Sequence, residues 1–323
     1  MRYILLFICF QFYLYANGHI FVYHRFDDLR YKSADTTASE LTTQFEYFKN
    51  NGYKVVSLSK IYKYLKEKKA IPDNWVALTI DDAYKSFYTN GLKTFKKYNY
   101  PFTLFVYTKA TDKKYGDFMT WDMIKDADKY GEIALHSYSH PHLLNLSTEE
   151  VNHDTKLAYE LFEQKMQYKP KYYAYPYGEF NNNIENELKK FDFDMILNQN
   201  SGSINTKSNP YSINRVALVG KVDIVKKLKY KTLDAQWIEP KEFPKDGILK
   251  FIKAKVSKDI KNIKLYITGE GWVNLKVKDG IIAYKLNAKL KNSRTRVVLS
   301  TDYYNIATKI IIKTKDPHGK WNF

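Results

Sequence analysis

Two adjacent carboxylates stand directly after an apolar segment of the chain. Residues 75–80 (WVALTI) are followed by Asp81 and Asp82. Charged carboxylates at the end of a buried strand are costly unless something pairs with them. One interpretation is an N-cap pair for a helix from Lys85 onward. The other is a reactive site, because adjacent side chains of an extended segment point to opposite sides. One aspartate could then face a metal ion and the other the reacting water.

The second cluster is a histidine-rich segment. Three of the seven histidines lie in HSYSHPHL, at His136, His140 and His142. Pro141 disfavours a helix at His140, so we predict a loop that curls back. Two imidazoles and one carboxylate can hold Zn²⁺ or another divalent cation and leave positions open for water and substrate. Since three protein ligands suffice, His142 is expected beside them or in solvent. The alternative is a set of unrelated surface histidines.

Three more strand-like segments carry reactive residues. The first ends in His24, another ends in Tyr177, and a late one contains Arg215. One polar strand end means little, but functional residues of parallel α/β barrels gather at the carboxyl ends of the strands. Five such segments therefore favour a single site at a barrel mouth.

The elements that must position these residues are short apolar strands that alternate with helices. Several strands are apolar on both faces, as in a parallel sheet covered by helices, and the alternation predicts a (β/α) barrel at 19–235. Ser147 and Glu150 form a capping box at the start of a helix. Gly52 and Gly131 are expected as left-handed helix caps. The predicted strands are 19–24, 53–58, 75–80, 102–108, 132–137, 172–177, 194–199 and 212–218.

The pattern changes near residue 240, where apolar and polar residues begin to alternate. This predicts a small antiparallel β-sandwich at 240–323, with residues 240–244 as the linker. The alternating runs are 247–256, 263–269, 272–278, 281–290, 295–302 and 307–314.

Positive charge is concentrated in the last third of the chain. The net charge is +17, and residues 221–323 hold 24 Lys and Arg against 10 Asp and Glu. A basic module on an exported protein favours an anionic partner in the cell envelope, either a polymer or lipid headgroups, over nucleic acid. The alternative is a lysine-rich surface that only confers solubility.

The N-terminus has the pattern of an export signal. Met1 and Arg2 precede an almost wholly apolar stretch at 3–15, and residues 16–18 (ANG) permit cleavage before His19. We therefore expect a signal peptide at 1–18 and a periplasmic or cell-surface location; an uncleaved anchor is the alternative. Cys9 is the only cysteine. A cleaved chain would have neither disulfides nor a thiolate metal site.

Three motifs resemble those of carbohydrate esterase family 4, the metal-dependent polysaccharide deacetylases. LTIDDAYKS (78–86) resembles the first motif, HSYSHP (136–141) the second and YAYPYG (173–178) the third. The flanking segments 45–65 and 102–125 are also similar, and the resemblance covers roughly residues 19–230. It implies a distorted (β/α) barrel of the polysaccharide deacetylase type.

The resemblance also implies roles for individual residues. Asp81 would be the general base, and Asp82, His136 and His140 would bind the metal, either Zn²⁺ or Ni²⁺, Co²⁺ or Fe²⁺. The backbone N–H of Tyr177 would stabilise the oxyanion.

The chain departs from the family pattern at two points. The arginine that often orients the base is replaced by Ala174, and Arg215 could take its place; the alternative is an ordinary surface cation. The usual L-x-x-H motif of the catalytic acid is missing, and His318 lies outside the barrel. In the circularly permuted branch that acts on biofilm polysaccharides, a first-strand Y-H supplies the acid. Tyr23 and His24 fit that placement.

Candidate sugar-binding residues are Trp121, Phe180 and Asn181, for which simple packing is the alternative. The expectation is an exported N-deacetylase of an N-acetylated polysaccharide. Poly-N-acetylglucosamine is favoured because of the permuted arrangement and the missing arginine. Peptidoglycan is the alternative substrate, and a non-catalytic carbohydrate-binding protein is the alternative class.

Overall fold

The computed structural model describes residues 17–315. Most of the predicted export signal, including Cys9, lies outside the described residues, as does His318. Within 17–315, no helix has the length and apolar character needed to cross a membrane.

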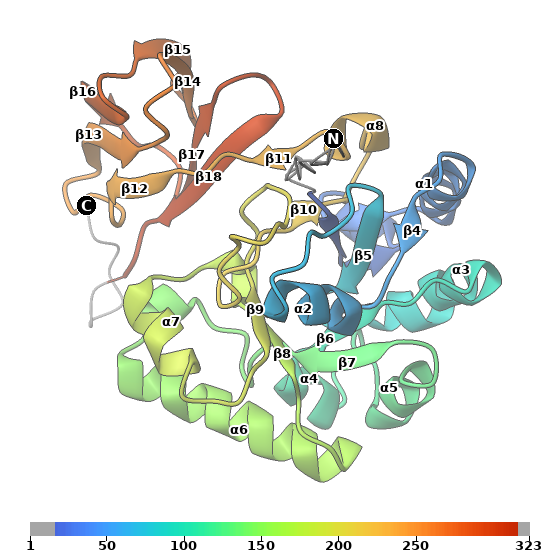
Figure 1. Ribbon diagram of the computed structural model, residues 1–323. Coiled ribbons are helices and arrows are strands. Elements are labelled where there is room, and N and C mark those ends of the chain that lie inside the picture. Colours follow the sequence, from blue (N-terminus) through green and yellow to red (C-terminus); the bar gives the residue numbers. More distant parts are fainter. Residues whose placement is uncertain (1–16, 316–323) are drawn as a thin grey trace, which may run out of the picture.

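A parallel sheet of eight strands forms the larger part of the molecule (Figure 1). Its order is β10-β1-β5-β6-β7-β8-β9, with β4 paired to β5. Leu197 also bridges Ile213, just before β10, and this contact brings the two ends of the sheet together. The predicted α/β barrel is therefore confirmed. The strands are β1 (His19–Tyr23), β4 (Lys54–Val55), β5 (Trp75–Ile80), β6 (Thr103–Val106), β7 (Glu132–Leu135), β8 (Tyr172–Ala174), β9 (Met195–Leu197) and β10 (Val216–Ala217).

Helices cover the outside of the sheet, and α6 runs along one side of the barrel (Figure 1). The capping box of Ser147 and Glu150 at the start of α6 is confirmed. The helices are α1 (Ala38–Asn50), α2 (Leu58–Lys66), α3 (Leu92–Tyr98), α4 (Thr108–Asp112), α5 (Trp121–Ala127), α6 (Thr148–Met166), α7 (Asn182–Leu188) and α8 (Ile224–Lys227). Short helical turns are η1 (Leu29–Tyr31), η2 (Phe87–Gly91), η3 (Leu143–Asn145) and η4 (Pro176–Gly178), and β2 (Arg25–Phe26) pairs with β3 (Asp35–Thr36).

One of the two predicted glycine caps is wrong. Gly52 has φ 74° and follows α1, as expected, whereas Gly131 does not have a left-handed backbone. A Cβ at Gly131 would lie 2.7 Å from the carbonyl oxygen of Phe102. Close approach to a neighbouring strand, rather than a helix cap, therefore requires glycine at this position.

The barrel strands are buried on both faces because they separate two apolar clusters. Along β5, Val76 and Leu78 belong to the cluster between sheet and helices, whereas Ala77 belongs to the cluster inside the barrel. The short β4 ends early because Ser57 caps α2. Burial on both faces explains why the strand sequences lack polar alternation.

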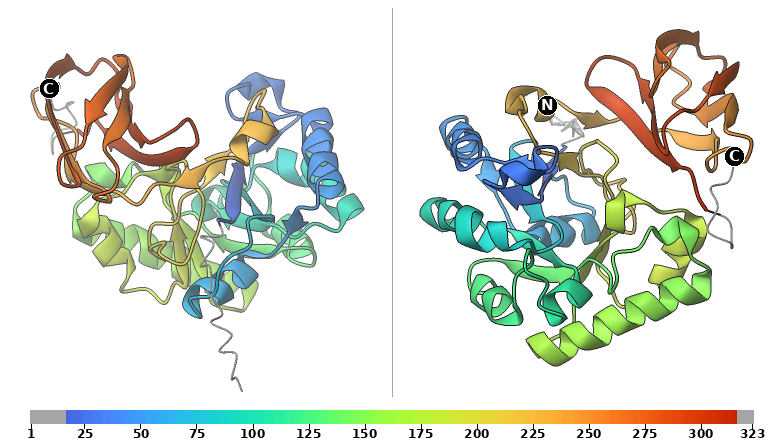
Figure 2. Two further views of the ribbon diagram at one scale, coloured as in Figure 1. Left: turned by 45° about the horizontal axis from the view of Figure 1, so that its top comes forward. Right: turned by 180° about the vertical axis from the view of Figure 1, so that it is seen from behind.

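The last third of the described chain forms two further sheets beside the barrel (Figures 1 and 2). One has the order β11-β18-β17-β14-β15 and the other β12-β13-β16. They share one core, which includes Leu249, Leu265 and Leu299. All six predicted runs overlap a strand. The predicted linker at 240–244 lies between β12 and β13, inside the C-terminal sheets and not between them and the barrel, because β11 and β12 already belong to these sheets. The strands are β11 (Lys231–Thr232), β12 (Gln236–Glu239), β13 (Ile248–Lys255), β14 (Asn262–Ile267), β15 (Gly271–Lys276), β16 (Ile281–Lys289), β17 (Arg294–Ser300) and β18 (Asn305–Ile312).

Candidate active site

Asp81 is buried and clamped by Arg215. The two guanidinium nitrogens Nη1 and Nη2 donate to the two carboxylate oxygens at 2.7 and 2.8 Å, and both residues are 0% exposed. Arg215 is fixed in turn by the carbonyl of Asn198 at 2.9 Å and the hydroxyl of Thr79 at 3.1 Å. Burial opposes ionisation of Asp81, but the charge and hydrogen bonds of Arg215 together with the nearby His136 and His24 outweigh it, so the pKa of Asp81 is lowered. Arg215 is therefore not a surface cation.

Asp82 faces the histidines rather than Arg215. The Asp82 backbone is left-handed, with φ 72°, so the segment is not extended as predicted. This turn, rather than strand alternation, sends the two carboxylates to different partners. Oδ1 of Asp82 lies 3.0 Å from Nε2 of His140 and 3.4 Å from Nε2 of His136. Neither aspartate caps a helix, so that interpretation is wrong.

His136 and His140 are held by the loop that follows β7. The Nδ1 of His136 lies 2.7 Å from the carbonyl of Ala174. With Nδ1–H donating there, the lone pair of Nε2 faces Asp82. Asp154, from α6, accepts hydrogen bonds from the N–H groups of Tyr138 and Ser139 at 2.9 Å. Asp154 therefore holds the loop between the two histidines.

These three side chains fit a divalent cation. The candidate ligand atoms of Asp82, His136 and His140 lie within 4.8 Å of one another. Asp82 Oδ1 is buried and accepts a hydrogen bond from none of the described residues, despite the imidazole 3.0 Å away. Burial lowers the pKa of His136 to about 4, so its imidazole is neutral at pH 7. One carboxylate and two imidazoles are a common donor set for Zn²⁺ and related ions.

His24 lies on the other side of Asp81, as the register of the sheet requires. Tyr23 of β1 is paired with Ile80 of β5, so the residues that follow, His24 and Asp81, emerge side by side. Nε2 of His24 lies 3.9 Å from Oδ2 of Asp81, and the His24 side chain is 19% exposed. His24 can therefore reach both Asp81 and a molecule at the barrel mouth.

Tyr177 stands at the same mouth in a strained backbone conformation. Its φ is 58°, and its ring stacks on His142 with centroids 4.1 Å apart. His142 is held by Glu179, whose carboxylate lies 3.0 Å from Nδ1. Burial raises the pKa of Glu179, and His142 opposes this effect. The Tyr177 N–H donates to none of the described residues, so it is available to a ligand.

Strained backbone is concentrated around this site. Of the eleven described non-glycine residues with positive φ, five belong to the three motif segments. Such strain persists where surrounding structure enforces it, and it clusters at functional sites. The five are Asp82, Ala83, Ser137, His140 and Tyr177.

The predicted sugar-binding residues occupy different places. Trp121 is half-buried against the main core, and its Nε1 has no partner among the described residues. Phe180 stacks on Tyr175 with centroids 4.8 Å apart. Asn181 uses Oδ1 to cap α7 through the Ile184 N–H. Phe180 and Asn181 both line a cleft beside the C-terminal sheets.

Sequence reasoning missed Asp154, Glu179 and Asn198. Each supports a predicted residue from a distant part of the chain, and none lies in one of the three motifs. The sequence signal that could have found Asp154 is its place on the apolar face of α6, between Val151 and Ala158.

The family comparison identifies the barrel. Residues 58–196 match the family model of polysaccharide deacetylase. The chain therefore contains a polysaccharide deacetylase domain, which confirms the family that the three motifs indicated.

The names of two similar proteins are more specific than the family description. The poly-beta-1,6-N-acetyl-D-glucosamine N-deacetylase of Escherichia coli K12 is 29% identical over 220 residues, which cover 55% of this chain and 32% of that protein. The protein of the same name from Staphylococcus aureus MSSA476 is 24% identical over 213 residues, covering 61% and 72%. The chain thus spans about a third of the length of the Escherichia coli relative.

Solved structures agree on the fold. The deacetylase PplD of Streptococcus pyogenes superposes with a TM-score of 0.61 at 19% identity, over 66% of this chain and 98% of that one. IcaB from Ammonifex degensii gives a TM-score of 0.58 at 21% identity, over 63% and 92%. Both matches leave about a third of this chain uncovered.

Proposed function

We propose that the protein is a metal-dependent polysaccharide N-deacetylase that removes acetyl groups from N-acetylhexosamine units. The observation that carries this proposal is the pair of aspartates with divided roles. Asp81 is clamped by Arg215, whereas Oδ1 of Asp82 faces the Nε2 atoms of His136 and His140. A non-catalytic carbohydrate-binding protein would not need this division.

Each residue of the site would have a separate role in the reaction. Asp82, His136 and His140 would hold the cation, which when bound supplies Lewis-acid polarisation and lowers the pKa of water. Asp81 would accept the proton of the attacking water, while Arg215 holds its carboxylate in one orientation. The Tyr177 N–H would donate to the developing oxyanion. His24 would protonate the sugar amine as the C–N bond breaks, releasing acetate.

The favoured substrate is a poly-N-acetylglucosamine exopolysaccharide. Two named relatives carry that activity in their names, and His24 occupies the first-strand position of the permuted branch. Peptidoglycan is the alternative substrate. The chemical step would be the same on both polymers.

The test is acetate release from a panel of acetylated polymers by the purified protein, with and without a chelator. Poly-N-acetylglucosamine and peptidoglycan are compared at equal acetyl content. The proposal expects chelator-sensitive release, with faster turnover of the exopolysaccharide. Release that persists in chelator-treated protein would contradict it.

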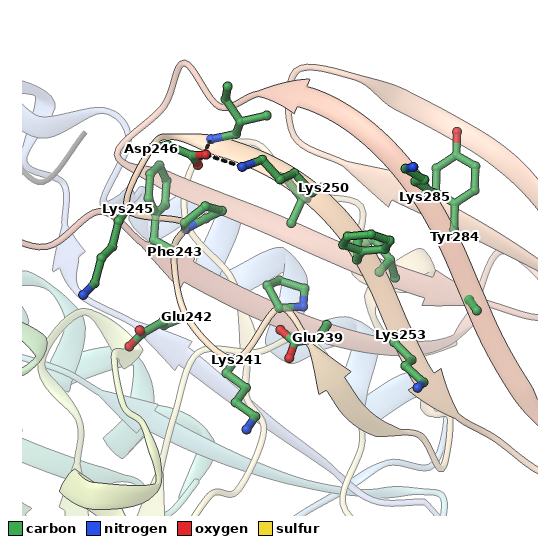
Figure 3. Close-up of a pocket in the computed structure, with 17 residues that line it drawn as sticks. Glu239, Lys241, Glu242, Phe243, Lys245, Asp246, Lys250, Lys253, Tyr284 and Lys285 are labelled. Atoms are coloured by element: carbon green, nitrogen blue, oxygen red, sulfur yellow. Dashed lines mark hydrogen bonds and ion pairs between the residues drawn. The ribbon is translucent and has the colours of Figure 1, made fainter.

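We also propose that the protein is exported and that the basic C-terminal sheets, which begin with β11 and β12, form an accessory domain that contacts anionic envelope material. A groove of about 790 Å³ lies on these sheets, and its lining includes Phe243 and Tyr284. Figure 3 shows the residues that line it. Its lining carries five lysines against three acids, Glu239, Glu242 and Asp246, and the metal-ligating residues are not part of it. The lysines are Lys241, Lys245, Lys250, Lys253 and Lys285.

Charge reversal tests this partner proposal. The variant Lys253→Glu/Lys285→Glu should bind anionic vesicles and anionic wall polymer less than the wild type does, because the lining of the groove loses its excess of lysines. Lys49→Glu/Lys93→Glu changes the net charge equally on the barrel helices α1 and α3. If both variants lost the same amount of binding, binding would depend only on net charge and not on the groove.

A further inference from the structure

Two adjoining cavities lie between the barrel and the C-terminal sheets, and together they form a cleft. It has two arms, of about 290 and 670 Å³. Four residues line both arms: Phe180 and Asn200 from barrel loops, Trp237 from β12 and Thr308 from β18. We call this space the junction cleft.

Two polar atoms in the junction cleft lack partners. Thr308 is 8% exposed, and its Oγ1 is buried with no hydrogen bond to any described residue. Asn200 Oδ1 is likewise buried without a described partner. Because an unpaired buried polar atom is destabilising, such atoms are rare and require an explanation. A ligand that donates hydrogen bonds into the cleft would provide it.

The smaller arm is lined mainly by neutral polar groups. Its two charged side chains, Lys207 and Asp234, lie 3.4 Å from each other and so offset one another. The remaining polar lining consists of amides and hydroxyls, which pair equally well with hydroxyl and acetamide groups. These side chains are Asn198, Asn200, Asn205, Asn209, Asn214, Ser208, Ser212, Thr232 and Thr308.

Two aromatic rings border the same space. Trp237 packs against the core of the C-terminal sheets, and Phe180 stacks on Tyr175. Both rings are only partly buried and line the cleft. An apolar ring face beside amides suits a pyranose ring. The C–H groups of the sugar would pack on the aromatic ring, and its hydroxyls would hydrogen-bond to the amides.

Residues that line the junction cleft are hydrogen-bonded to the buried Arg215 at the base of the candidate active site. Asn198 and Asn200, which line the cleft, accept hydrogen bonds from Nε and the backbone N–H of Arg215 at 2.9 and 3.2 Å. Phe180 follows Glu179, which holds His142 beside Tyr177. A ligand in the cleft would therefore lie against segments that also position Arg215 and Tyr177.

We propose that the junction cleft is a second saccharide-binding site, which holds neutral N-acetylated hexosamine units of the same polymer. The proposal rests on the proposed function for the class of sugar. It makes the C-terminal sheets a part of the polymer-binding surface through Trp237 and Thr308.

The test measures binding rather than turnover. The full chain is treated with chelator and titrated calorimetrically with the hexamer of N-acetylglucosamine. Trp237→Ala should weaken the Kd roughly fivefold to tenfold, because an aromatic contact is lost. Trp272→Ala is the matched control, since Trp272 lies on β15 outside the cleft and is 56% exposed. It should retain the wild-type Kd.

Thr308→Val provides a second variant that does not threaten the fold. It removes the unpartnered hydroxyl and keeps the side-chain volume and β-branching, so the thermal midpoint should rise. Hexamer affinity should fall about threefold in the same variant, because a hexamer that hydrogen-bonds to this hydroxyl would lose one partner. A purely structural threonine would not produce these opposite changes.

The outcomes separate this inference from the proposed function. Equal hexamer binding by wild type, Trp237→Ala and Thr308→Val overturns the junction-cleft site, even if wild type releases acetate. Binding that depends on Trp237 and Thr308 supports the site, even if metal-loaded wild type releases no acetate and the deacetylase function fails.

Discussion

The structure gives the clearest expectation for the stability cost of breaking the Arg215–Asp81 ion pair. Both side chains are 0% exposed, and the two charges share two short hydrogen bonds. Arg215→Met would leave the Asp81 carboxylate buried without compensation. Removing one partner of a buried ion pair costs about 3–5 kcal/mol of unfolding free energy. Asp81→Leu should cost a similar amount, because it leaves the guanidinium unpaired.

The double variant Arg215→Met/Asp81→Leu isolates the coupling. The double variant should lose less free energy of unfolding than the two single variants lose together, since neither charge remains to be desolvated. The assay is urea unfolding of chelator-treated protein, so that a bound metal does not contribute. Arg296→Met, at an exposed position of β17, serves as a control with an expected change within about 0.5 kcal/mol. Additive losses, or a loss below about 1 kcal/mol for Arg215→Met, would refute the clamp.

Three further perturbations test separate parts of the site and fold. His24→Ala should keep the metal content of wild type but lower kcat about a hundredfold, as expected for a general acid; unchanged kcat would exclude His24 from the mechanism. Asp154→Asn replaces a carboxylate that accepts two loop N–H groups at 2.9 Å, and it should weaken metal affinity about tenfold in a competition titration; wild-type affinity would mean that the loop holds its shape without Asp154. His19 is buried with its pKa lowered to about 4, so its stabilising effect is complete above pH 6.5 and is lost as the pH falls toward 4. Between pH 7 and 4, the free energy of unfolding measured in urea should fall by about 3 kcal/mol more for the wild type than for His19→Gln. If the free energy of unfolding of the two proteins changed in parallel with pH, the buried neutral imidazole would be contradicted.

The sequence was sufficient for the barrel, because burial on both faces leaves apolar strands without polar alternation. It was also sufficient to bring Asp82, His136 and His140 together, since their segments end strands of one parallel sheet. The pairing of Arg215 with Asp81 was one of two open interpretations. Only the strand register, which no local pattern encodes, decided between them.

Other features could not be predicted, for physical reasons. Gly131 was misread because a helix cap and a close backbone approach both require glycine. The positive φ of Asp82 is enforced by surrounding packing, so the extended conformation assumed for the aspartates was wrong. Asp154 and Glu179 act on partners 15 and 37 residues away in the chain. The junction cleft depends on how β12 and β18 lie beside the barrel loops, which is a tertiary relation.

The most direct test of the central claim joins metal content to acetate release in one experiment. Wild type and Asp82→Asn are purified, assayed for bound divalent metal, and given acetylated glucosamine oligomers with and without added Zn²⁺. We predict that wild type binds about one ion per chain and releases acetate, whereas Asp82→Asn binds the ion far more weakly and releases at least about a hundredfold less. Acetate release by Asp82→Asn at the wild-type rate, with equal metal content, would contradict the assignment of this site.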